Sequence, residues 1–113
     1  MTAYRGEIWL INLNPVKKSN EVGKIRPALV MQNNELNAGA YPTTIILPLT
    51  TSLIDDAEPL RYRVSKREEL EKDSDILITN IRAIDNRRFI EKLASLTNKE
   101  LSFVKNLLDE VLS

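Results

Sequence analysis

Three short polar segments interrupt or adjoin apolar stretches of the sequence, and each carries side chains suited to binding an anion. The first, Glu21-Val22-Gly23-Lys24-Ile25-Arg26, runs directly into Pro27. Proline disfavours helical geometry in the residue before it, so Arg26 is expected to be extended at the mouth of a strand. A guanidinium fixed in this way can bind phosphoryl oxygens through paired N–H donors. The alternative is an ordinary surface arginine that precedes a strand.

The second and third segments add hydroxyl and amide groups. Thr50, Thr51 and Ser52 follow one another at the end of a predicted strand. Hydroxyls in such a place either cap a turn or, beside an arginine, hold a phosphate. Asn80 and Arg82 stand two residues apart in another predicted strand, so they share one of its faces. They are candidates to contact nucleic-acid bases and phosphate, or they form the solvated face of an antiparallel strand.

Composition narrows the chemistry that these segments can perform. The 113 residues include no histidine and no cysteine. The chain therefore has no imidazole base, no Ser-His-Asp triad, no thiolate nucleophile, no disulfide and no sulfur-ligated zinc. Sixteen Lys and Arg balance sixteen Asp and Glu, so there is no net charge to attract nucleic acid. Locally the balance is uneven, because residues 1–34 carry five basic and two acidic side chains.

The elements that must position the polar segments are mostly short strands. Aliphatic, aromatic and β-branched residues bounded by turn signals predict strands over residues 7–13, 27–32, 43–50, 60–64, 75–84 and 90–96. Pro48 cannot donate to a strand ladder, which places it at an edge, a bulge or a strand end. Residues 16–24 are predicted to form a loop, and Asn33-Asn34 a turn.

Two segments have the residue spacing of a helix N-terminus. Ser65-Lys66-Arg67-Glu68 has the capping-box spacing with few residues after it, which predicts a single helical turn. Thr97-Asn98-Lys99-Glu100 precedes an apolar stripe, which predicts an amphipathic helix over about 98–112. Short strands followed by one helix predict a mostly β, α+β fold, a small barrel closed by a C-terminal helix. The length favours a single domain over residues 1–113.

Taken in order, these segments resemble the MazF/PemK toxins of bacterial type II toxin–antitoxin systems. The matching segments cover residues 5–9, 12–15, 21–30, 47–51, 73–77 and 81–88. The resemblance implies an SH3-like barrel, usually a homodimer, and a metal-independent endoribonuclease without cofactor that cuts single-stranded RNA at short sequences. In this reaction the RNA's own 2′-hydroxyl attacks the adjacent phosphate and leaves a 2′,3′-cyclic phosphate and a 5′-hydroxyl. The protein must then orient the RNA and stabilise a phosphorane, which requires neither Cys nor His.

By the same resemblance, the candidate catalytic residues are Arg26, Thr50 and Glu21. Arg26 would stabilise the phosphorane, Thr50 would hydrogen-bond a phosphoryl oxygen, and Glu21 would be a base or hold the loop. The candidate RNA-binding residues are Lys17, Lys18, Lys24, Thr51, Ser52, Asn80 and Arg82. Many relatives carry an acidic residue and Gln where this chain has Thr79-Asn80, which argues against a carboxylate-based role in this strand.

The resemblance also implies partners: RNA, a second copy of the chain, and an antitoxin whose acidic C-terminal tail would cover the basic loop. The sequence has no apolar run near the ~18 residues of a membrane span and no signal-peptide pattern, so we expect a bacterial cytoplasmic protein without a membrane partner. Two alternatives remain. One is a gyrase poison like the CcdB toxins of the same fold, which residues 109–113 disfavour because they include no aromatic side chain. The other is an RNA-binding homologue that does not cut.

Overall fold

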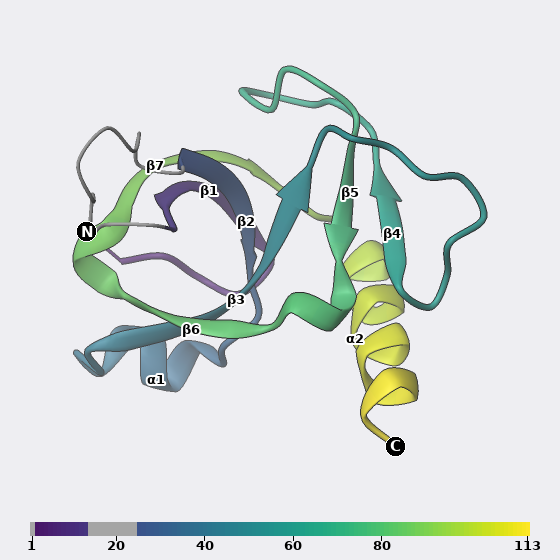
Figure 1. Ribbon diagram of the computed structural model, residues 1–113. Helices are drawn as coiled ribbons and strands as arrows, with labels where there is room; N and C mark the ends of the chain where they lie inside the picture. Colours follow the sequence, from purple (N-terminus) through teal and green to yellow (C-terminus); the bar gives the residue numbers. More distant parts are fainter. Residues whose placement is uncertain (1, 14–24) are drawn as a thin grey trace, which may run out of the picture.

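The computed structural model describes residues 2–13 and 25–113. Its elements in chain order are β1 (Glu7–Asn12), β2 (Ile25–Val30), α1 (Asn34–Ala38), β3 (Thr43–Thr50), β4 (Arg61–Val64), β5 (Ser74–Leu77), the 3-10 turn η1 (Ile78–Asn80), β6 (Arg82–Asp85), the 3-10 turn η2 (Asn86–Arg88), β7 (Phe89–Ser95) and α2 (Asn98–Leu112). The predicted fold class is confirmed, since a curved antiparallel sheet is followed by one C-terminal helix (Figure 1). No helix within the described residues is long and apolar enough to cross a membrane.

β3 is the strand that connects the two parts of the sheet. The strand order is β4-β5-β3-β2-β1-β7, and β6 pairs with β3 outside this path. β3 pairs with β6 through residues 43–46 and with β5 through residues 49 and 50. Pro48 lies between these two pairings, so on that side of β3 no partner requires its N–H; on the other side it lies opposite Ala28 of β2. Among the described residues the barrel stays open, because β4 and β7 end the path without pairing.

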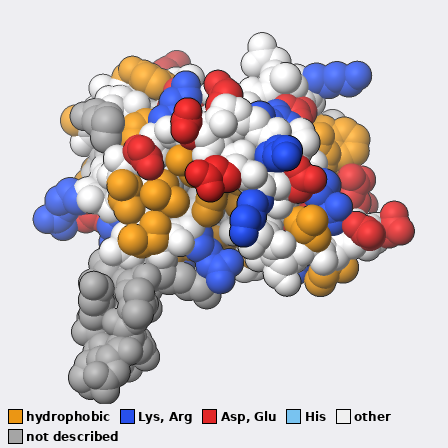
Figure 2. Space-filling model, turned by 90° about the horizontal axis from the view of Figure 1, so that it is seen from above, with side chains coloured by type: hydrophobic (Ala, Val, Ile, Leu, Met, Phe, Trp, Pro, Cys, Tyr) orange, Lys and Arg blue, Asp and Glu red, His pale blue; other side chains and the backbone are white. Residues whose placement is uncertain are grey.

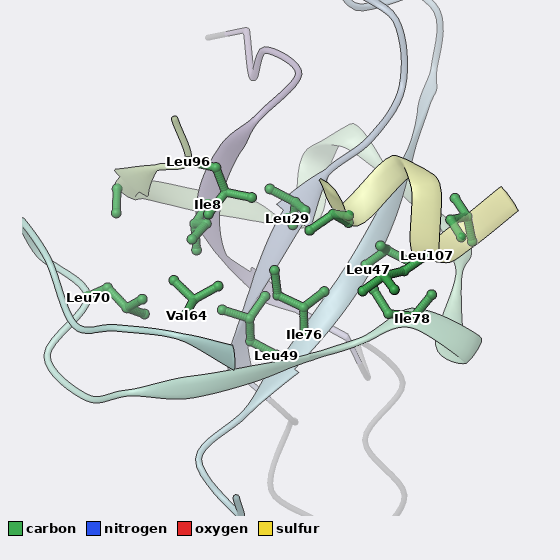
Figure 3. Close-up of a cluster of buried hydrophobic side chains, with 13 residues drawn as sticks. Ile8, Leu29, Leu47, Leu49, Val64, Leu70, Ile76, Ile78, Leu96 and Leu107 are labelled. Carbon is green, nitrogen blue, oxygen red and sulfur yellow. The ribbon is translucent and has the colours of Figure 1, made fainter. Parts of the chain in front are cut away.

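The central strands are buried on both faces, which explains why their sequences are almost continuously apolar. On one face, Ile8, Leu29 and Leu47 belong to the cluster that packs against α2 (Figure 3). On the other face, Trp9 belongs to a second cluster with Ile84 of β6, and its ring meets Phe89 edge-on at a centroid distance of 5.9 Å. The two clusters therefore bury most residues of β1, β2 and β3, and the exposed positions are single residues such as Ile25 and Ile45.

α2 begins at the predicted capping box. The Thr97 hydroxyl accepts a hydrogen bond from the Glu100 N–H (3.1 Å), and Glu100 Oε1 accepts one from the Thr97 N–H (2.9 Å). Arg67, from the turn before β5, binds both oxygens of the same carboxylate, with N···O distances of 2.5 and 2.9 Å. These hydrogen bonds from Arg67 hold the pKa of Glu100 at about 2, against the effect of burial. Glu100 therefore both caps α2 and attaches it to the segment before β5.

Gly6 connects three elements at the start of β1. Its N–H donates to the Val30 carbonyl and its carbonyl accepts from the Leu96 N–H, both at 2.9 Å. Its φ of +90° lies in the region that favours glycine, and an added Cβ would lie 3.2 Å from Leu101 Cδ2. The backbone angle therefore favours glycine here, and a Cβ would in addition require Leu101 to move slightly.

Two predictions of secondary structure are wrong. The strand expected over residues 75–84 is divided into β5 and β6 by η1, because its two halves pair with separate stretches of β3. The helical turn expected at residues 65–68 is instead a tight turn closed by an Arg67–Leu70 bridge, in which Glu68 has φ of +50°. Asn33, predicted in a turn, caps the short helix α1 by accepting from the Leu36 N–H (3.0 Å). The predicted loop at residues 16–24 lies outside the described residues.

Candidate active site

An open cavity of about 510 Å³ lies at the ends of several strands. Its described lining residues are Leu13, Arg26, Pro48, Leu49, Thr50, Arg61, Leu77, Asn80 and Arg82. We call it the arginine cavity, because three of these residues are arginines and none of the described ones is acidic. Arginine side chains are protonated at neutral pH and carry only donors, so this lining is arranged to bind an anion.

The strands bring these residues together from distant parts of the sequence. Arg26 is the second residue of β2 and lies opposite Ile11 of β1. Thr50 ends β3, the strand next to β2, and lies opposite Asp75 of β5. Thr50 Oγ1 accepts a hydrogen bond from the Ser52 N–H (3.1 Å), which fixes the oxygen and leaves its proton for donation. The predicted pair of an arginine and a hydroxyl is therefore present in one cavity.

Asn80 and Arg82 also line the arginine cavity. They do so although they do not lie in the one continuous strand that the sequence predicted. Asn80 ends η1 and Arg82 begins β6, where it lies opposite Ile46 of β3. The Asn80 amide oxygen accepts from the Thr79 hydroxyl at 3.3 Å, and Arg82 Nη2 lies 3.5 Å from the Leu13 carbonyl oxygen. The turn at η1, not the pleat of a strand, places both side chains at the cavity.

Two other predicted residues, Thr51 and Ser52, do not line this cavity. Thr51 lines a separate cavity of about 350 Å³, together with Leu10, Leu93 and acidic side chains. Ser52 is exposed and contributes its backbone, since its carbonyl accepts from Arg61 Nη1 (2.9 Å). Outside the described part of the chain lie Lys17, Lys18, Glu21 and Lys24.

Arg61 is a cavity residue that sequence reasoning missed, and it is held by a buried carboxylate. Asp75, whose side chain is 1% exposed, accepts from Arg63 Nε (2.5 Å), the Ile54 N–H (2.9 Å) and Arg61 Nη1 (3.1 Å). Burial alone would raise the pKa of Asp75, but these hydrogen bonds from Arg63, Ile54 and Arg61 together hold it below its ordinary value. The signal in the sequence was an aspartate beside three apolar residues, since a buried carboxylate requires cationic partners.

The surface around these elements carries charges of both signs. Seen from above, acidic, basic and hydrophobic side chains lie intermixed on one face of the molecule (Figure 2). This face shows no large area of one sign of charge (Figure 2). Positive charge is concentrated locally, in the arginine cavity.

The fold and the cavity define a class: a small, mostly β protein with an arginine-lined cavity at its strand ends. Residues 4–112 match the family of PemK-like, MazF-like toxins of type II toxin–antitoxin systems. The chain is 38% identical over 107 residues to the endoribonuclease MazF of Staphylococcus saprophyticus, covering 93% of this chain and 87% of that protein. It is 37% identical to the Staphylococcus epidermidis endoribonuclease MazF over the same shares of the two chains.

Solved structures show the same fold. A MazE–MazF crystal structure from Deinococcus radiodurans superposes with a TM-score of 0.81 at 24% identity, covering 99% of this chain and 96% of that one. A MazF structure from the same organism gives a TM-score of 0.77 at 23% identity, covering 99% and 97%. The chain belongs to the family of PemK-like, MazF-like toxins, as its sequence pattern predicted.

Proposed function

We propose that this protein is the toxin of a type II toxin–antitoxin system and acts as an endoribonuclease on single-stranded RNA. The observation that carries the proposal is the arginine cavity, which combines Arg26, Thr50, Asn80 and Arg82 with no acidic side chain in its described lining. The staphylococcal relatives at 37–38% identity are named endoribonucleases, which supports the same activity here. We propose that the protein acts in the bacterial cytoplasm, where such an RNA substrate is made.

The cavity offers the charge stabilisation that cleavage by an internal nucleophile needs. The 2′-oxygen of the RNA forms a bond to the adjacent phosphorus, the bond from phosphorus to the 5′-oxygen breaks, and the products are a 2′,3′-cyclic phosphate and a 5′-hydroxyl. One proton leaves the 2′-hydroxyl and one joins the 5′-oxygen. Arg26 stabilises the negative charge of the phosphorane, and the Thr50 hydroxyl donates to one of its oxygens. Because the positive charge comes from arginines and the nucleophile from the RNA, we propose that the reaction needs no metal ion.

The proton of the 2′-hydroxyl requires an acceptor, and an arginine does not serve at neutral pH. Glu21 is the proposed base, or else it holds the loop that precedes β2. Lys17, Lys18 and Lys24 are proposed to bind RNA phosphates from the same loop. Since successive protein–phosphate contacts make binding salt-dependent, cleavage at low RNA concentration should slow as ionic strength rises.

We further propose that the protein works as a homodimer and is neutralised by an antitoxin. Ile25 and Ile81, the sequence neighbours of Arg26 and Arg82, are 54% and 38% exposed, so apolar surface adjoins the site where a second copy would complete it. The acidic tail of an antitoxin would meet the arginines of the cavity, whose described lining has no acidic side chain, and would exclude RNA by competition.

The test is cleavage of a long RNA in the presence of EDTA, with detection of the cyclic phosphate. Arg26→Ala should lower the cleavage rate by about 100- to 1,000-fold, the usual effect of removing one donor to a developing oxyanion. Arg87→Ala is the matched control, because the Arg87 side chain is 90% exposed and lies outside the arginine cavity. The Arg87→Ala protein should cut RNA at the wild-type rate. Undiminished cutting by a folded Arg26→Ala protein contradicts the proposal. Binding of RNA without any cyclic product would favour a non-cutting homologue instead.

A further inference from the structure

We propose that Arg61 is a third arginine of the RNA site, where it binds the backbone phosphate next to the one held by Arg26 and Thr50, and that Asp75 positions it. The inference rests on the proposed endoribonuclease function and adds a binding residue and a positioning residue to it. It is carried by three observations: the place of Arg61 between two cavities, the hydrogen bonds that hold it, and the strand order around it.

Arg61 begins β4 and reaches the arginine cavity from the side opposite to Arg26. It also lines a neighbouring cavity of about 570 Å³ whose acidic side chains are Asp55, Asp56, Glu58 and Asp75, and of these only Asp75 forms a salt bridge with Arg61. A single nitrogen, Nη1, donates to both the Ser52 carbonyl (2.9 Å) and Asp75 Oδ2 (3.1 Å). Its Nε and Nη2 have no hydrogen-bond partner within the described residues. The guanidinium is thus fixed by one nitrogen, while its remaining donors are left for a ligand.

Asp75 does not need Arg61 as its only counter-charge. Arg63 makes the shorter contact with it, 2.5 Å from Nε to Oδ1, and the Ile54 N–H binds the other oxygen at 2.9 Å. Arg63 is also paired with Asp55 at 2.9 Å, so its charge is shared between two carboxylates. Arg61 forms a salt bridge with one carboxylate among the described residues, that of Asp75, which Arg63 also binds. On its other side Arg61 faces the arginine cavity, whose described lining has no acidic residue. Arg61 is therefore only partly neutralised by Asp75, and its remaining donors and charge face the arginine cavity.

The strand order explains why Arg61 would bind a different phosphate from Arg26. Arg26 lies on β2, Thr50 on β3 and Arg61 on β4, in the spatial order β2-β3-β5-β4. Three steps between neighbouring strands, at about 4.8 Å each, separate the backbones of β2 and β4 by about 14 Å along the sheet. An RNA strand that crosses these strand ends meets Arg26 and Thr50 at the cleaved phosphate, and Arg61 at the next phosphate beyond Thr50.

The experiment first maps the cleavage site of the wild-type protein on a long RNA. An oligonucleotide of that sequence, with a 2′-deoxy nucleotide at the cut, then measures binding without cleavage. Arg61→Gln should weaken binding by about tenfold or more, as expected for the loss of a charged hydrogen-bonded contact. The slope of log K against log salt concentration should become shallower by about 0.7, the value for one phosphate contact on a single strand.

Arg63→Gln is the matched control, because Arg63 contacts the same Asp75 but lines the neighbouring cavity and not the arginine cavity. It should keep the wild-type affinity and salt slope. Arg61→Lys keeps the positive charge but loses the planar guanidinium fork. This variant should bind RNA more weakly with an unchanged salt slope. It replaces Arg61→Gln in the test if Arg61→Gln does not fold. Asp75→Asn should weaken binding in the wild-type background and have no further effect in Arg61→Gln, as a positioning role requires.

An Arg61→Gln protein with the wild-type affinity and slope overturns the inference while leaving the proposed function intact. An equal loss in Arg63→Gln also overturns it, because the effect would then be structural. An equal loss from Asp75→Asn in both backgrounds overturns the positioning role of Asp75. If the wild-type protein neither cuts nor binds RNA, the proposed function and this inference fail together.

Discussion

Lowering the pH should weaken the attachment of α2 to the segment before β5 through the protonation of a single side chain, Glu100. The hydrogen bonds from Arg67 hold its pKa at about 2, against an ordinary value of 4.5. Because the folded pKa is the lower one, the unfolded chain binds the proton more readily. The contribution of Glu100 to stability is therefore complete above pH 4.5 and is lost as the pH falls from 4.5 towards 2.

The size of the effect follows from the same pKa difference. A tenfold change in proton affinity is equivalent to about 1.4 kcal/mol, so the fall from 4.5 to about 2 corresponds to about 3 kcal/mol. Both side chains of the Arg67–Glu100 pair keep about a fifth of their surface exposed, and solvent screens the pair accordingly. We therefore expect about 2 kcal/mol at neutral pH, of which less than half should remain at pH 3.

The assay is urea unfolding between pH 3 and pH 7, followed by the fluorescence of Trp9, the single tryptophan and a buried one. Glu100→Gln keeps a side chain that can complete the capping box but removes the titrating carboxylate. Its deficit in unfolding free energy against the wild type should shrink as the pH falls. Asp109→Asn is the control on the same helix, since its exposed pair with Lys105 contributes little. Wild-type and Glu100→Gln curves that run parallel over the whole range would refute the reasoning.

Two further predictions concern the core. Gly6→Ala should lower the free energy of unfolding by about 1–2 kcal/mol, because alanine is strained at φ of +90° and its Cβ would press on Leu101; an unchanged melting temperature would contradict this. Leu47→Ala should cost about 2–5 kcal/mol, because Leu47 is fully buried between the sheet and α2. Leu112→Ala, at a site 66% exposed, should change stability by less than about 0.5 kcal/mol, and equal losses in the two variants would rule out the described packing.

The sequence predicted most elements of the fold because their signals are local. The range of β3 and the cap of α2 came from apolar runs and from the spacing of Thr97 and Glu100. The break between β5 and β6 could not be predicted in this way. Residues 75–84 are apolar throughout most of their length, and what divides them is pairing with separate stretches of β3. Residues 65–68 have the spacing of a capping box but do not form a helical turn. Arg67 binds Glu100, 33 residues away, and such a contact cannot be predicted from a local pattern.

The sequence could predict those residues of the candidate site that lie at the ends of predicted strands. Arg26 and Thr50 were identified by their positions and by the resemblance to the toxin family, and they do line one cavity. Arg61 was missed because a polar residue in an alternating strand is ordinarily solvated. Its assignment depends on Asp75, 14 residues further along the chain, and on the register that places β4 beside β5. Thr51 shows the converse, since a neighbour of a site residue in sequence lines a different cavity.

The route of the chain through the arginine cavity determines when a working site first exists during synthesis. The described lining begins at Leu13 and ends at Arg82, so no shorter stretch of the chain contains all of it. The strands that carry it are themselves packed on α2, residues 98–112, which the ribosome makes after all of them. A nascent chain therefore has no assembled cavity until synthesis has passed the last strand and the helix can dock. Fragments that end before α2 should therefore lack endoribonuclease activity.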